Sequence, residues 1–586
     1  MTEPTPQPQI TVLDAGGQYC HLIARRVREF GIYADVCPSD TPAAALAGRR
    51  GIIVSGGPSS VYDPGSPSMD TAILASPAAV LGICYGQQLM AHLLDGAVRP
   101  GERGEYGLAR LEIESPSALF DGLEPHQQVW MSHRDVVEAV PSGFSVLART
   151  ETCAVAAMAD PARRLYAVQF HPEVVHTRRG REILSNFLFR VCGCEKDWDP
   201  RARIPLIERS IREAAGGRKV FFFVSGGVDS AVAYTLCRRA LGEGRVQGAY
   251  VDTGLMREAE TESVERAFPA LGIVREQDAF LGALAGVSDP ERKRLIIGEM
   301  FVDVQERILQ SGRYLEEDWI LGQGTIYPDT IESGGTAQAD LIKTHHNRVA
   351  GIRRLIEANR VVEPLRSLYK DEVRAVGREL GLPGEILDRH PFPGPGLAIR
   401  CLCSETTAGL ERLEDGWLIP VRSVGVQGDS RSYRAALLLD DPATDEDPRE
   451  RATTIINRLT SINRVVAMLR SHARPEQMQV SPGGLTPDRL DRLRRADAIV
   501  RRLSHEHGFD GKVWQFPVVL IPLGRPGQPD SVVLRPVDSV DGMTAQAVMI
   551  EAPLADRICS ELLEVDGVCA VLHDLTHKPP ATIEWE

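Results

Sequence analysis

Gly82-Ile83-Cys84-Tyr85-Gly86 and Ser225-Gly226-Gly227-Val228-Asp229-Ser230 are the two stretches that decide the fold and the chemistry of this chain. Each follows a short apolar run, 80–83 or 220–224, and precedes a helical pattern. A strand that passes through glycines into a helix is typical of α/β folds with parallel strands. The sequence therefore predicts two such sheets, one with a thiol at the turn and one with a loop suited to phosphate.

The hydrophobic pattern around these stretches extends the prediction. We expect strands at 10–13, 51–54, 80–83, 220–224 and 247–251, and helices at 21–30 and 87–94. This alternation predicts parallel sheets with helices on both faces. The stretch Pro391-Phe392-Pro393-Gly394-Pro395-Gly396 closes the second series, because prolines fix φ and lack an N–H, so neither a helix nor a central strand can include it.

Composition excludes several classes of protein. The chain has 586 residues, 43% hydrophobic and 25% charged, and a formal net charge of −14. Roughly three to four domains fit this length, at about 150 residues each. An acidic chain argues against nucleic-acid and anionic-membrane partners. No apolar run approaches the roughly 20 residues that span a bilayer. The start lacks a secretory pattern, and eleven scattered cysteines favour reduced thiols, so we expect a cytoplasmic protein.

The first stretch carries the features of a nucleophile. Flanking glycines permit the tight turn that exposes Cys84, and the following helix N-terminus favours a thiolate and an oxyanion. Phe170-His171-Pro172-Glu173 supplies a base with an orienting carboxylate, because His171 and Glu173 point to the same side of an extended segment. Together these residues predict a catalytic triad rather than a buried structural thiol.

The order of these pieces resembles the class I glutamine amidotransferase domain, over about residues 9–192, and we assign this domain to 9–194. The resemblance implies that Cys84, His171 and Glu173 hydrolyse glutamine through a γ-glutamyl thioester. It also implies an oxyanion loop at Ser55-Gly56-Gly57-Pro58. The oxyanion and glutamine-binding residues implied are Gly57, Tyr85, Gln88, Ser132 and His133.

The second stretch is suited to an anion, because its glycines let backbone N–H groups converge at a helix N-terminus. Ser225 and Ser230 can donate hydroxyl hydrogen bonds. Asp229 makes sense in a phosphate cradle where it helps to hold a cation, and Mg²⁺ is the cation expected. The loop is not a Walker A loop, since it lacks the Gly-Lys-Ser/Thr ending.

This loop resembles the PP-loop of the N-type ATP pyrophosphatases, with an adenine nucleotide α-hydrolase-like parallel sheet, and we assign that domain to 200–400. The ATP-binding residues implied are Ser225, Gly226, Gly227, Val228, Asp229, Ser230 and Val251. The strings at 321–333, 342–347 and 390–400 closely resemble the GMP synthetase family. That family implies ATP as co-substrate and Mg²⁺.

The C-terminal string, 578–586, and the string 424–433 extend the same resemblance, which runs over about 9–586. We assign an α+β C-terminal domain to 401–586. The residues implied to bind xanthosine monophosphate (XMP) are Asp429, Arg431, Gln515, Lys578 and Glu584. Arginine suits bidentate recognition of phosphate.

An internal repeat marks the last third of the chain. Ile455, Leu459, Ile462, Val465 and Leu469 recur 103 positions later as Ile558, Leu562, Val565, Val568 and Leu572. In both copies a helical spacing gives way to a strand-like apolar run, which favours a duplicated α/β lobe. We assign the inserted lobe to about 435–530, as in the long form of the family. If this lobe replaces a partner subunit, the protein is a monomer; a homodimer is the alternative.

The resemblance implies a ligase of purine biosynthesis that adenylates XMP with ATP and aminates it to GMP with ammonia from glutamine. Two alternatives are another PP-loop amidase, such as NAD synthetase, and a PP-loop tRNA thiolase. The C-terminal string argues against the first. The second requires cysteines near the PP-loop and a basic face, whereas Cys237 is alone there and the chain is acidic.

Overall fold

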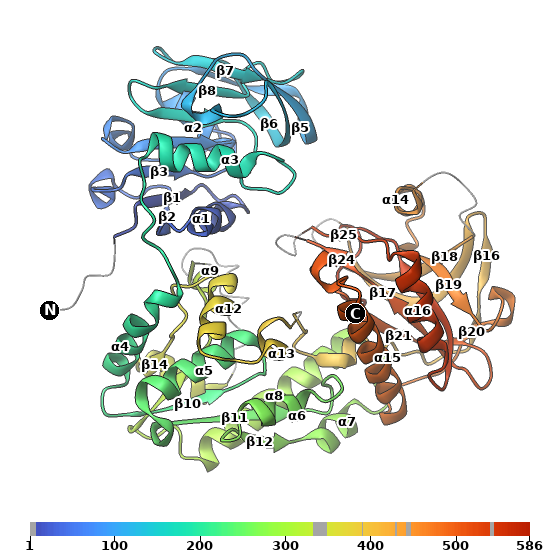
Figure 1. The fold of residues 1–586 in the computed structure, drawn as a ribbon. Coiled ribbons are helices and arrows are strands. Elements are labelled where there is room, and N and C mark those ends of the chain that lie inside the picture. Colours follow the sequence, from blue (N-terminus) through green and yellow to red (C-terminus); the bar gives the residue numbers. More distant parts are fainter. Residues whose placement is uncertain (1–6, 332–348, 390, 428–429, 441–446, 540–543) are drawn as a thin grey trace. The chain divides into compact units, whose positions relative to one another are not determined.

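A computed structural model describes residues 7–331, 349–389, 391–427, 430–440, 447–539 and 544–586. The chain forms two compact units, Met1–Ala202 and Arg203–Glu586. The first holds a nine-stranded sheet, and the second holds a five-stranded and a seven-stranded sheet (Figure 1).

The first unit is built on the sheet β2-β1-β3-β4-β9-β8-β7-β5-β6. Its strands are β1 (Ile10–Asp14), β2 (Ala34–Pro38), β3 (Gly51–Val54), β4 (Ala79–Ile83), β5 (Ala97–Ile113), β6 (His126–Ala139), β7 (Ser145–Arg149), β8 (Ala157–Asp160) and β9 (Leu165–Val168). Its α-helices are α1 (Cys20–Glu29), α2 (Tyr85–Leu93) and α3 (Gly180–Ser185). The three predicted strands and two predicted helices of this region are confirmed.

The sheet of the first unit is parallel over only part of its width. Neighbours from β2 to β9 pair in parallel, whereas β8, β7, β5 and β6 join in antiparallel pairs. The prediction of a parallel sheet is therefore right for the half that carries Cys84 and incomplete for the rest. In β6 buried and more exposed side chains largely alternate, as expected where an antiparallel strand has one face toward water.

The second unit begins with the parallel sheet β12-β11-β10-β13-β14. Its strands are β10 (Lys219–Phe223), β11 (Val246–Asp252), β12 (Gly272–Arg275), β13 (Trp319–Gly322) and β14 (Val361–Val362). The helices around it are α4 (Ile204–Ala215), α5 (Val228–Leu241), α6 (Glu260–Ala267), α7 (Gln277–Leu284), α8 (Pro290–Ser311), α9 (Tyr327–Ile331), α11 (Ala350–Glu357), α12 (Lys370–Glu379) and α13 (Gly384–Leu387).

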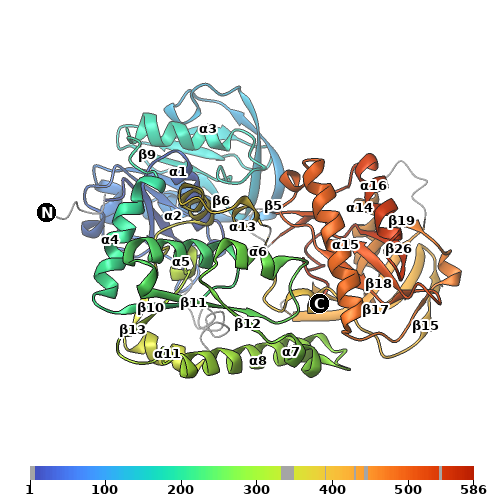
Figure 2. The same ribbon diagram turned by 60° about the horizontal axis from the view of Figure 1, so that its bottom comes forward.

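The phenylalanines of β10 show why this sheet needs helices on both faces. Phe221 packs in one cluster with Leu309 of α8 and Ile352 of α11. Phe222 points to the opposite face, where its ring meets that of Tyr234 in α5 edge to face. Figure 2 shows α5 on one side of the sheet and α8 and α11 on the other. A strand buried on both faces reads as the continuous apolar run seen in the sequence.

The seven-stranded sheet, β16-β17-β18-β19-β26-β23-β21, contains both copies of the predicted repeat. Its strands are β16 (Glu411–Leu413), β17 (Gly416–Gln427), β18 (Ser430–Leu439), β19 (Ile462–Ser471), β21 (Val518–Ile521), β23 (Asp530–Leu534) and β26 (Val568–Asp574). The helices of this region are α14 (Pro448–Arg458), α15 (Pro487–Glu506) and α16 (Ala552–Leu563). Five short strands form two small separate sheets: β15 (Ala408–Gly409), β20 (Gln479–Val480) and β22 (Leu523–Gly524) form one, and β24 (Val537–Asp538) and β25 (Gln546–Ala547) form the other.

The repeat is longer in the structure than in the sequence. Strands β17 and β18 are antiparallel and α14 leads to β19, which is parallel to β18. Strands β21 and β23 are likewise antiparallel, and α16 leads to β26, which is parallel to β23. Two ββαβ units thus share one sheet, and they join through the antiparallel pair β19–β26. The helix–strand pattern read from the sequence is the second half of each unit.

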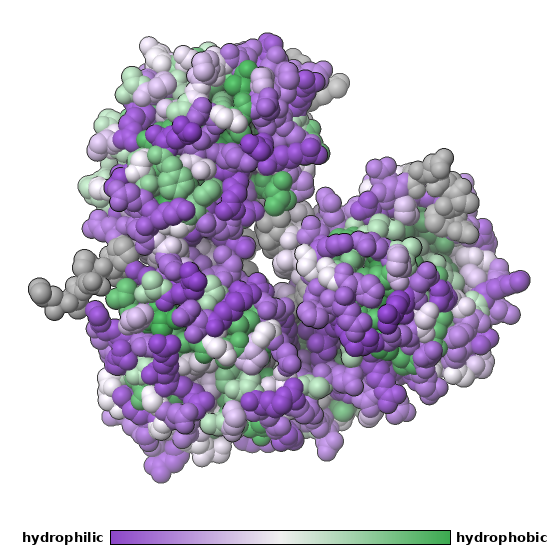
Figure 3. Space-filling model, in the orientation of Figure 1, coloured by the Kyte–Doolittle hydropathy of each residue, from purple (hydrophilic) through white to green (hydrophobic). Residues whose placement is uncertain are grey.

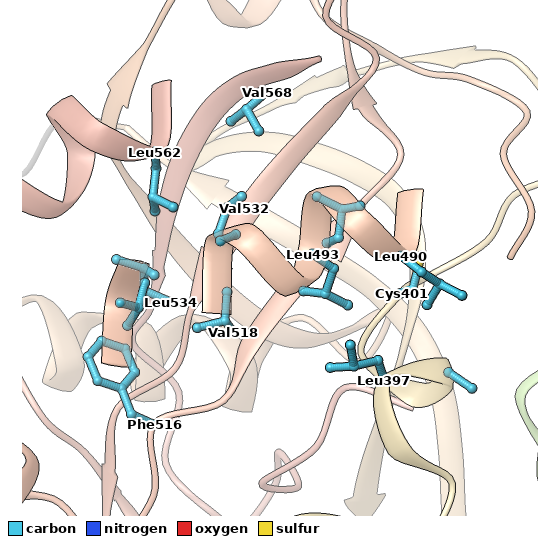
Figure 4. Close-up of a cluster of buried hydrophobic side chains, with 14 of the residues drawn as sticks. Leu397, Cys401, Leu490, Leu493, Phe516, Val518, Val532, Leu534, Leu562 and Val568 are labelled. Carbon is cyan, nitrogen blue, oxygen red and sulfur yellow. The ribbon is translucent and has the colours of Figure 1, made fainter. Parts of the chain in front are cut away.

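One hydrophobic core joins the two sheets of the second unit. Buried residues from α7, α8 and the segment after the Pro/Gly stretch pack in the same cluster as α15, α16, β21, β23 and β26. Leu490 of α15 lies beside Cys401 at one side of this cluster (Figure 4). The Pro/Gly stretch itself forms neither helix nor strand before the 3-10 turn Gly396–Ile399, as predicted.

The face of the molecule shown in Figure 3 is mainly hydrophilic. On the face shown in Figure 3, hydrophobic residues occur in small patches among charged and polar ones. Within the part of the chain that the structure describes, no helix is long and apolar enough to cross a membrane.

Candidate active sites

The turn between β4 and α2 holds Cys84 in the conformation of a nucleophile elbow. Its backbone has a φ of 52°, in the left-handed region that side chains rarely adopt. The flanking glycines are required by close backbone contact. A Cβ at Gly82 would lie 2.5 Å from the carbonyl oxygen of Gly86, and a Cβ at Gly86 would lie 2.4 Å from that of Val54. The predicted elbow is therefore present.

His171 and Glu173 meet Cys84 in a buried cluster. The Nδ1 atom of His171 lies 2.7 Å from Oε1 of Glu173, and His171 also hydrogen-bonds the thiol of Cys84. Burial lowers the pKa of His171, but the charges of Glu173 and Cys84 outweigh it and raise the pKa to about 10. Tyr19 packs edge to face on the imidazole, 5.2 Å between ring centres. An imidazolium beside a thiol is the arrangement that activates cysteine nucleophiles.

The loop at 55–57 lies directly against this cluster. A Cβ at Gly56 would lie 3.0 Å from Cε1 of His171, and one at Gly57 would lie 2.4 Å from the carbonyl oxygen of Ala15. At Gly57 a side chain would require the backbone to move, and at Gly56 it would require the imidazole of His171 to shift. The predicted oxyanion loop and the thiol thus share one site.

The other residues predicted to bind glutamine surround Cys84, with their polar atoms partly engaged. The backbone carbonyl of Ser132 accepts a hydrogen bond from Cys84 Sγ at 3.6 Å. The Nε2 atom of Gln88 donates to the carbonyl of Asp135 at 2.8 Å. His133 is buried, with its Nε2 atom 3.3 Å from a carboxylate oxygen of Glu105. The hydroxyl of Tyr85 bonds away from the thiol, to the carbonyl of Pro67.

Glu105 was missed by sequence reasoning. Burial raises its pKa, but the nearby imidazole of His133 and the hydroxyl of Thr152 hold the pKa of this carboxyl below its usual value. It thereby fixes the imidazole of His133 from the neighbouring strand β5. No local motif marks Glu105, because the contact depends on strand pairing.

The second site is the loop between β10 and α5. Gly226 has a φ of 76°, and Gly227 caps α5, which begins at Val228. The hydroxyls of Ser225 and Ser230 lie 3.1 Å apart, and Ser225 Oγ accepts from the N–H of Gly227 at 3.3 Å. The loop is thus a turn at a helix N-terminus lined by two hydroxyls, as expected for phosphate.

Asp229 has a partner that sequence reasoning missed. Nζ of Lys370, the first residue of α12, forms an ion pair with Oδ2 of Asp229. Oδ1 of Asp229 is buried and has no hydrogen-bond partner among the described residues. Mg²⁺ bound with a nucleotide usually takes one or two carboxylates and completes its shell with phosphates and water, so a single free carboxylate oxygen fits it. Among the described residues, no group of three His, Cys, Asp or Glu could hold a metal.

Neighbouring strands complete this edge of the sheet. Val251, at the end of β11, is buried with 7% of its surface exposed. Beyond β13, a Cβ at Gly324 would lie 2.9 Å from the backbone of Asp229 and Ser230. The glycine-rich string at 321–325 therefore packs against the phosphate loop. The predicted string 342–347 lies outside the described residues.

The residues predicted to bind the acceptor come from three places in the second unit. Arg431 on β18 reaches Glu291 at the start of α8, with an Nη1–Oε1 distance of 3.1 Å. Gln515 is largely buried and pairs with Val537 through its backbone. Lys578 bonds through its backbone to Ala545. Asp429 lies outside the described residues.

Glu584 is held by Arg400, which donates two hydrogen bonds to it, at 2.9 and 2.6 Å. Arg400 is 1% exposed. Burial lowers its pKa, but the charge of Glu584 outweighs burial and raises the pKa of this guanidinium above its usual value. Glu584, which is predicted to bind the acceptor, is thus tied to the segment that follows the Pro/Gly stretch.

Two further arginines hold the backbone of the tail. Arg464 donates to the carbonyls of Thr582 and Glu584, at 3.0 and 2.6 Å, and Arg535 donates to that of Thr582 at 2.8 Å. Both guanidiniums share the carboxylate of Asp574, at 2.8 and 2.9 Å, and all three side chains are fully buried. This triad fixes the segment that carries Lys578 and Glu584.

Comparison with known proteins decides the family. The model of the class-I glutamine amidotransferase family matches residues 11–191, and that of the GMP synthase C-terminal domain matches residues 503–585. The probable glutamine-hydrolysing GMP synthase of Leptospira interrogans is 41% identical over 602 aligned residues, which cover 99% of each chain. The chain belongs to the glutamine-hydrolysing GMP synthase family. The family's enzyme from Parafrankia is also 41% identical, over 98% of this chain and 96% of its own.

Among solved structures, a protein from Thermoplasma acidophilum described as a putative GMP synthase subunit is 31% identical over 31% of this chain and 93% of its own, with a TM-score of 0.29. The full-length GMP synthase relatives confirm the resemblance inferred from the two motifs and the C-terminal string. They leave the NAD synthetase and tRNA thiolase alternatives without support. Cys237, the thiol nearest to the phosphate loop in sequence, is fully buried in α5, and burial raises its pKa.

Proposed function

We propose that this chain makes GMP from XMP, ATP and glutamine, and that the two sites divide the reaction between them. The observation that carries the proposal is that one chain, which aligns over 99% of its length with a GMP synthase relative, contains both the buried Cys84–His171–Glu173 cluster and a loop at a helix N-terminus with an acidic side chain. The cluster can release ammonia, and the loop can hold a nucleoside triphosphate.

In the first unit, Cys84 Sγ attacks the side-chain amide carbon of glutamine. His171 takes the thiol proton, the new S–C bond replaces the C–N bond, and His171 gives a proton to the departing nitrogen, which leaves as ammonia. Water then attacks the thioester, with His171 as base, and glutamate and the free thiol are formed. Glu173 fixes the imidazole through its 2.7 Å contact. Backbone N–H groups of Gly57 and Tyr85 stabilise the oxyanion, a contribution of about 10²–10³ in rate.

Gln88, Ser132 and His133 line the glutamine site in this proposal. Their position around Cys84 supports it, because Ser132 touches the thiol through its carbonyl and Gln88 lies on the helix that follows the elbow. Glu105 then serves to fix His133 rather than to touch glutamine.

In the second unit, the loop 225–230 receives the phosphates of ATP, and Val251 lies beside the adenosine. The O2 atom of XMP attacks the α-phosphorus, the bond to the β-phosphate breaks and pyrophosphate leaves. Ammonia then attacks C2 of the adenylylated XMP and loses a proton, the C2–O bond breaks, and AMP leaves with that oxygen. Lys370 and the serines of the loop neutralise and orient the phosphates. Asp229 would hold Mg²⁺, which would supply further neutralisation of phosphate charge.

Asp429, Arg431, Gln515, Lys578 and Glu584 bind XMP in this proposal. The buried arginines 400, 464 and 535 support it, since they hold the tail in one conformation. A pre-formed tail loses less conformational entropy when the acceptor binds.

We also propose three domains, at 9–194, 200–400 and 401–586, with an inserted lobe at about 435–530. The two ββαβ units within one sheet support a monomer, because each half already has a partner in the same chain. A mass near 64.2 kDa that does not change with concentration is expected in light scattering, and a stable dimer would contradict it. Eleven cysteines without a disulfide support a reducing, cytoplasmic location.

The test of the function is a product assay with ATP, XMP and glutamine, in which IMP and UMP replace XMP as controls. When XMP is the acceptor, we expect GMP, AMP, pyrophosphate and glutamate to form in equal amounts. When IMP or UMP replaces XMP, we expect no aminated product. Formation of ADP in place of AMP, or indifference to XMP, would refute the proposal.

A further inference from the structure

Three arginines surround the ring of Phe392 in the Pro/Gly stretch of the second unit. Their guanidinium carbons lie 4.5 Å (Arg257), 5.6 Å (Arg389) and 5.3 Å (Arg400) from the ring centre. Each distance is within the range of a cation–π contact. The ring is half-buried and borders the main core of the unit.

Each arginine reaches a different part of the unit. Arg389 donates from Nη1 to the carbonyl oxygen of Gly226 in the phosphate loop, at 3.2 Å. Arg400 holds Glu584 of the tail with two hydrogen bonds. Arg257 lies 3.4 Å from a carboxylate oxygen of Asp497 in α15. The phosphate loop and the tail are therefore connected through three side chains, those of Arg389, Phe392 and Arg400.

The positive charges make the energy of this junction, formed by Phe392 with Arg257, Arg389 and Arg400, sensitive to how closely the arginines approach one another. Burial lowers the pKa of Arg257 to about 10, and the charges of Arg400 and Arg389 act in the same direction against that of Asp497. The arginines thus repel one another, and the electron-rich faces of one ring, whose edge is electropositive, limit how closely they approach. Arg389 also forms an ion pair with Glu260 of α6. If the ring is lost, each guanidinium can move toward its own carboxylate independently of the others.

We propose that Phe392 is a positioning residue, which through Arg389 and Arg400 holds the phosphate loop and the C-terminal tail in the relative position that adenylyl transfer requires. The proposal rests on the proposed function, because it takes the loop as the ATP site and the tail as part of the XMP site. It requires that ATP and XMP strengthen each other's binding, reciprocally and through this junction.

The experiment compares the natural chain with Phe392→Leu and Phe392→Tyr. Leucine keeps an apolar side chain without a π-face, and tyrosine keeps the face. Isothermal titration gives the Kd of XMP and of α,β-methylene-ATP, each alone and with the other at saturation. In the natural chain we expect each ligand to tighten the other by about fivefold or more. In Phe392→Leu we expect this factor to fall to about one while each Kd measured alone changes by less than about threefold, and in Phe392→Tyr we expect it to persist.

A matched control is Phe144→Leu in the first unit, where Arg163 lies 5.4 Å from the ring centre. This variant should keep the full coupling factor. The proposal is overturned if Phe392→Leu keeps the coupling, if the leucine and tyrosine variants lose it equally, or if the natural chain binds the two ligands independently. Absence of XMP binding in the natural chain is a separate result, which refutes the proposed function and the proposal with it.

Discussion

His171 Nδ1 lies 2.7 Å from Glu173 Oε1, and neither side chain is accessible to more than 5%. The carboxylate and Cys84 raise the pKa of His171 to about 10 against the effect of burial. The imidazolium is then the stable form up to that pH. In Glu173→Gln the negative charge is lost, so the alkaline limb of the pH profile for glutamate release should move down by about one pH unit or more.

The same pair affects stability, because the folded pKa lies above the unfolded value of 6.5. Its contribution is complete below pH 6.5 and is lost as the pH rises toward 10. A thermal scan of the natural chain should show this loss, and Glu173→Gln should show less of it. If the alkaline limb of the pH profile for glutamate release is unchanged in Glu173→Gln, Glu173 does not control the pKa of His171.

Lys370 should be required for synthesis from either nitrogen source. Its ion pair with Asp229 sets the position of both side chains at the phosphate loop. In Lys370→Met, ammonium-dependent GMP formation should fall by about tenfold or more, since one charge that faces the phosphates is lost. The control is Lys512→Met, which removes an exposed ion pair with Glu551 and should leave the rate unchanged. Equal rates in the two variants would remove Lys370 from the site.

Asp574 should be among the most sensitive positions for stability. Asp574→Asn leaves Arg464 and Arg535 buried without their shared carboxylate. Removal of one partner from a buried ion pair costs about 3–5 kcal/mol. Calorimetry should therefore show a clearly lower transition temperature for the second unit. Asp556→Asn, which breaks an exposed pair with Arg470, should cost about 1 kcal/mol or less. A similar small effect at Asp574 would contradict the role given to the triad.

Local patterns in the sequence predicted the parts of the fold that depend on neighbouring residues. The apolar runs at 10–13, 51–54, 80–83 and 220–224 are strands, and glycines beside Cys84 predicted the elbow, because a positive φ is a local requirement. His171 and Glu173 were found together because they are two residues apart.

Contacts between distant residues could not be predicted in this way. Lys370 is 141 residues from Asp229, and Arg400 is 184 residues from Glu584. A single charged residue in a sequence gives no signal of its partner, which is set by how the strands and helices pack. The antiparallel half of the first sheet was missed for a similar reason: strand direction beyond β9 follows from hairpin connections rather than from hydrophobicity.

The division of labour between the two sites is tested most directly by GMP formation in Cys84→Ala and Asp229→Ala, each assayed with glutamine and with ammonium. Cys37→Ala, at a partly exposed thiol of the same unit, is the control and should keep both activities. Cys84→Ala should lose the glutamine-dependent rate and keep the ammonium-dependent rate, whereas Asp229→Ala should lose both. Loss of the ammonium-dependent rate in Cys84→Ala, or survival of either rate in Asp229→Ala, would contradict two separate sites.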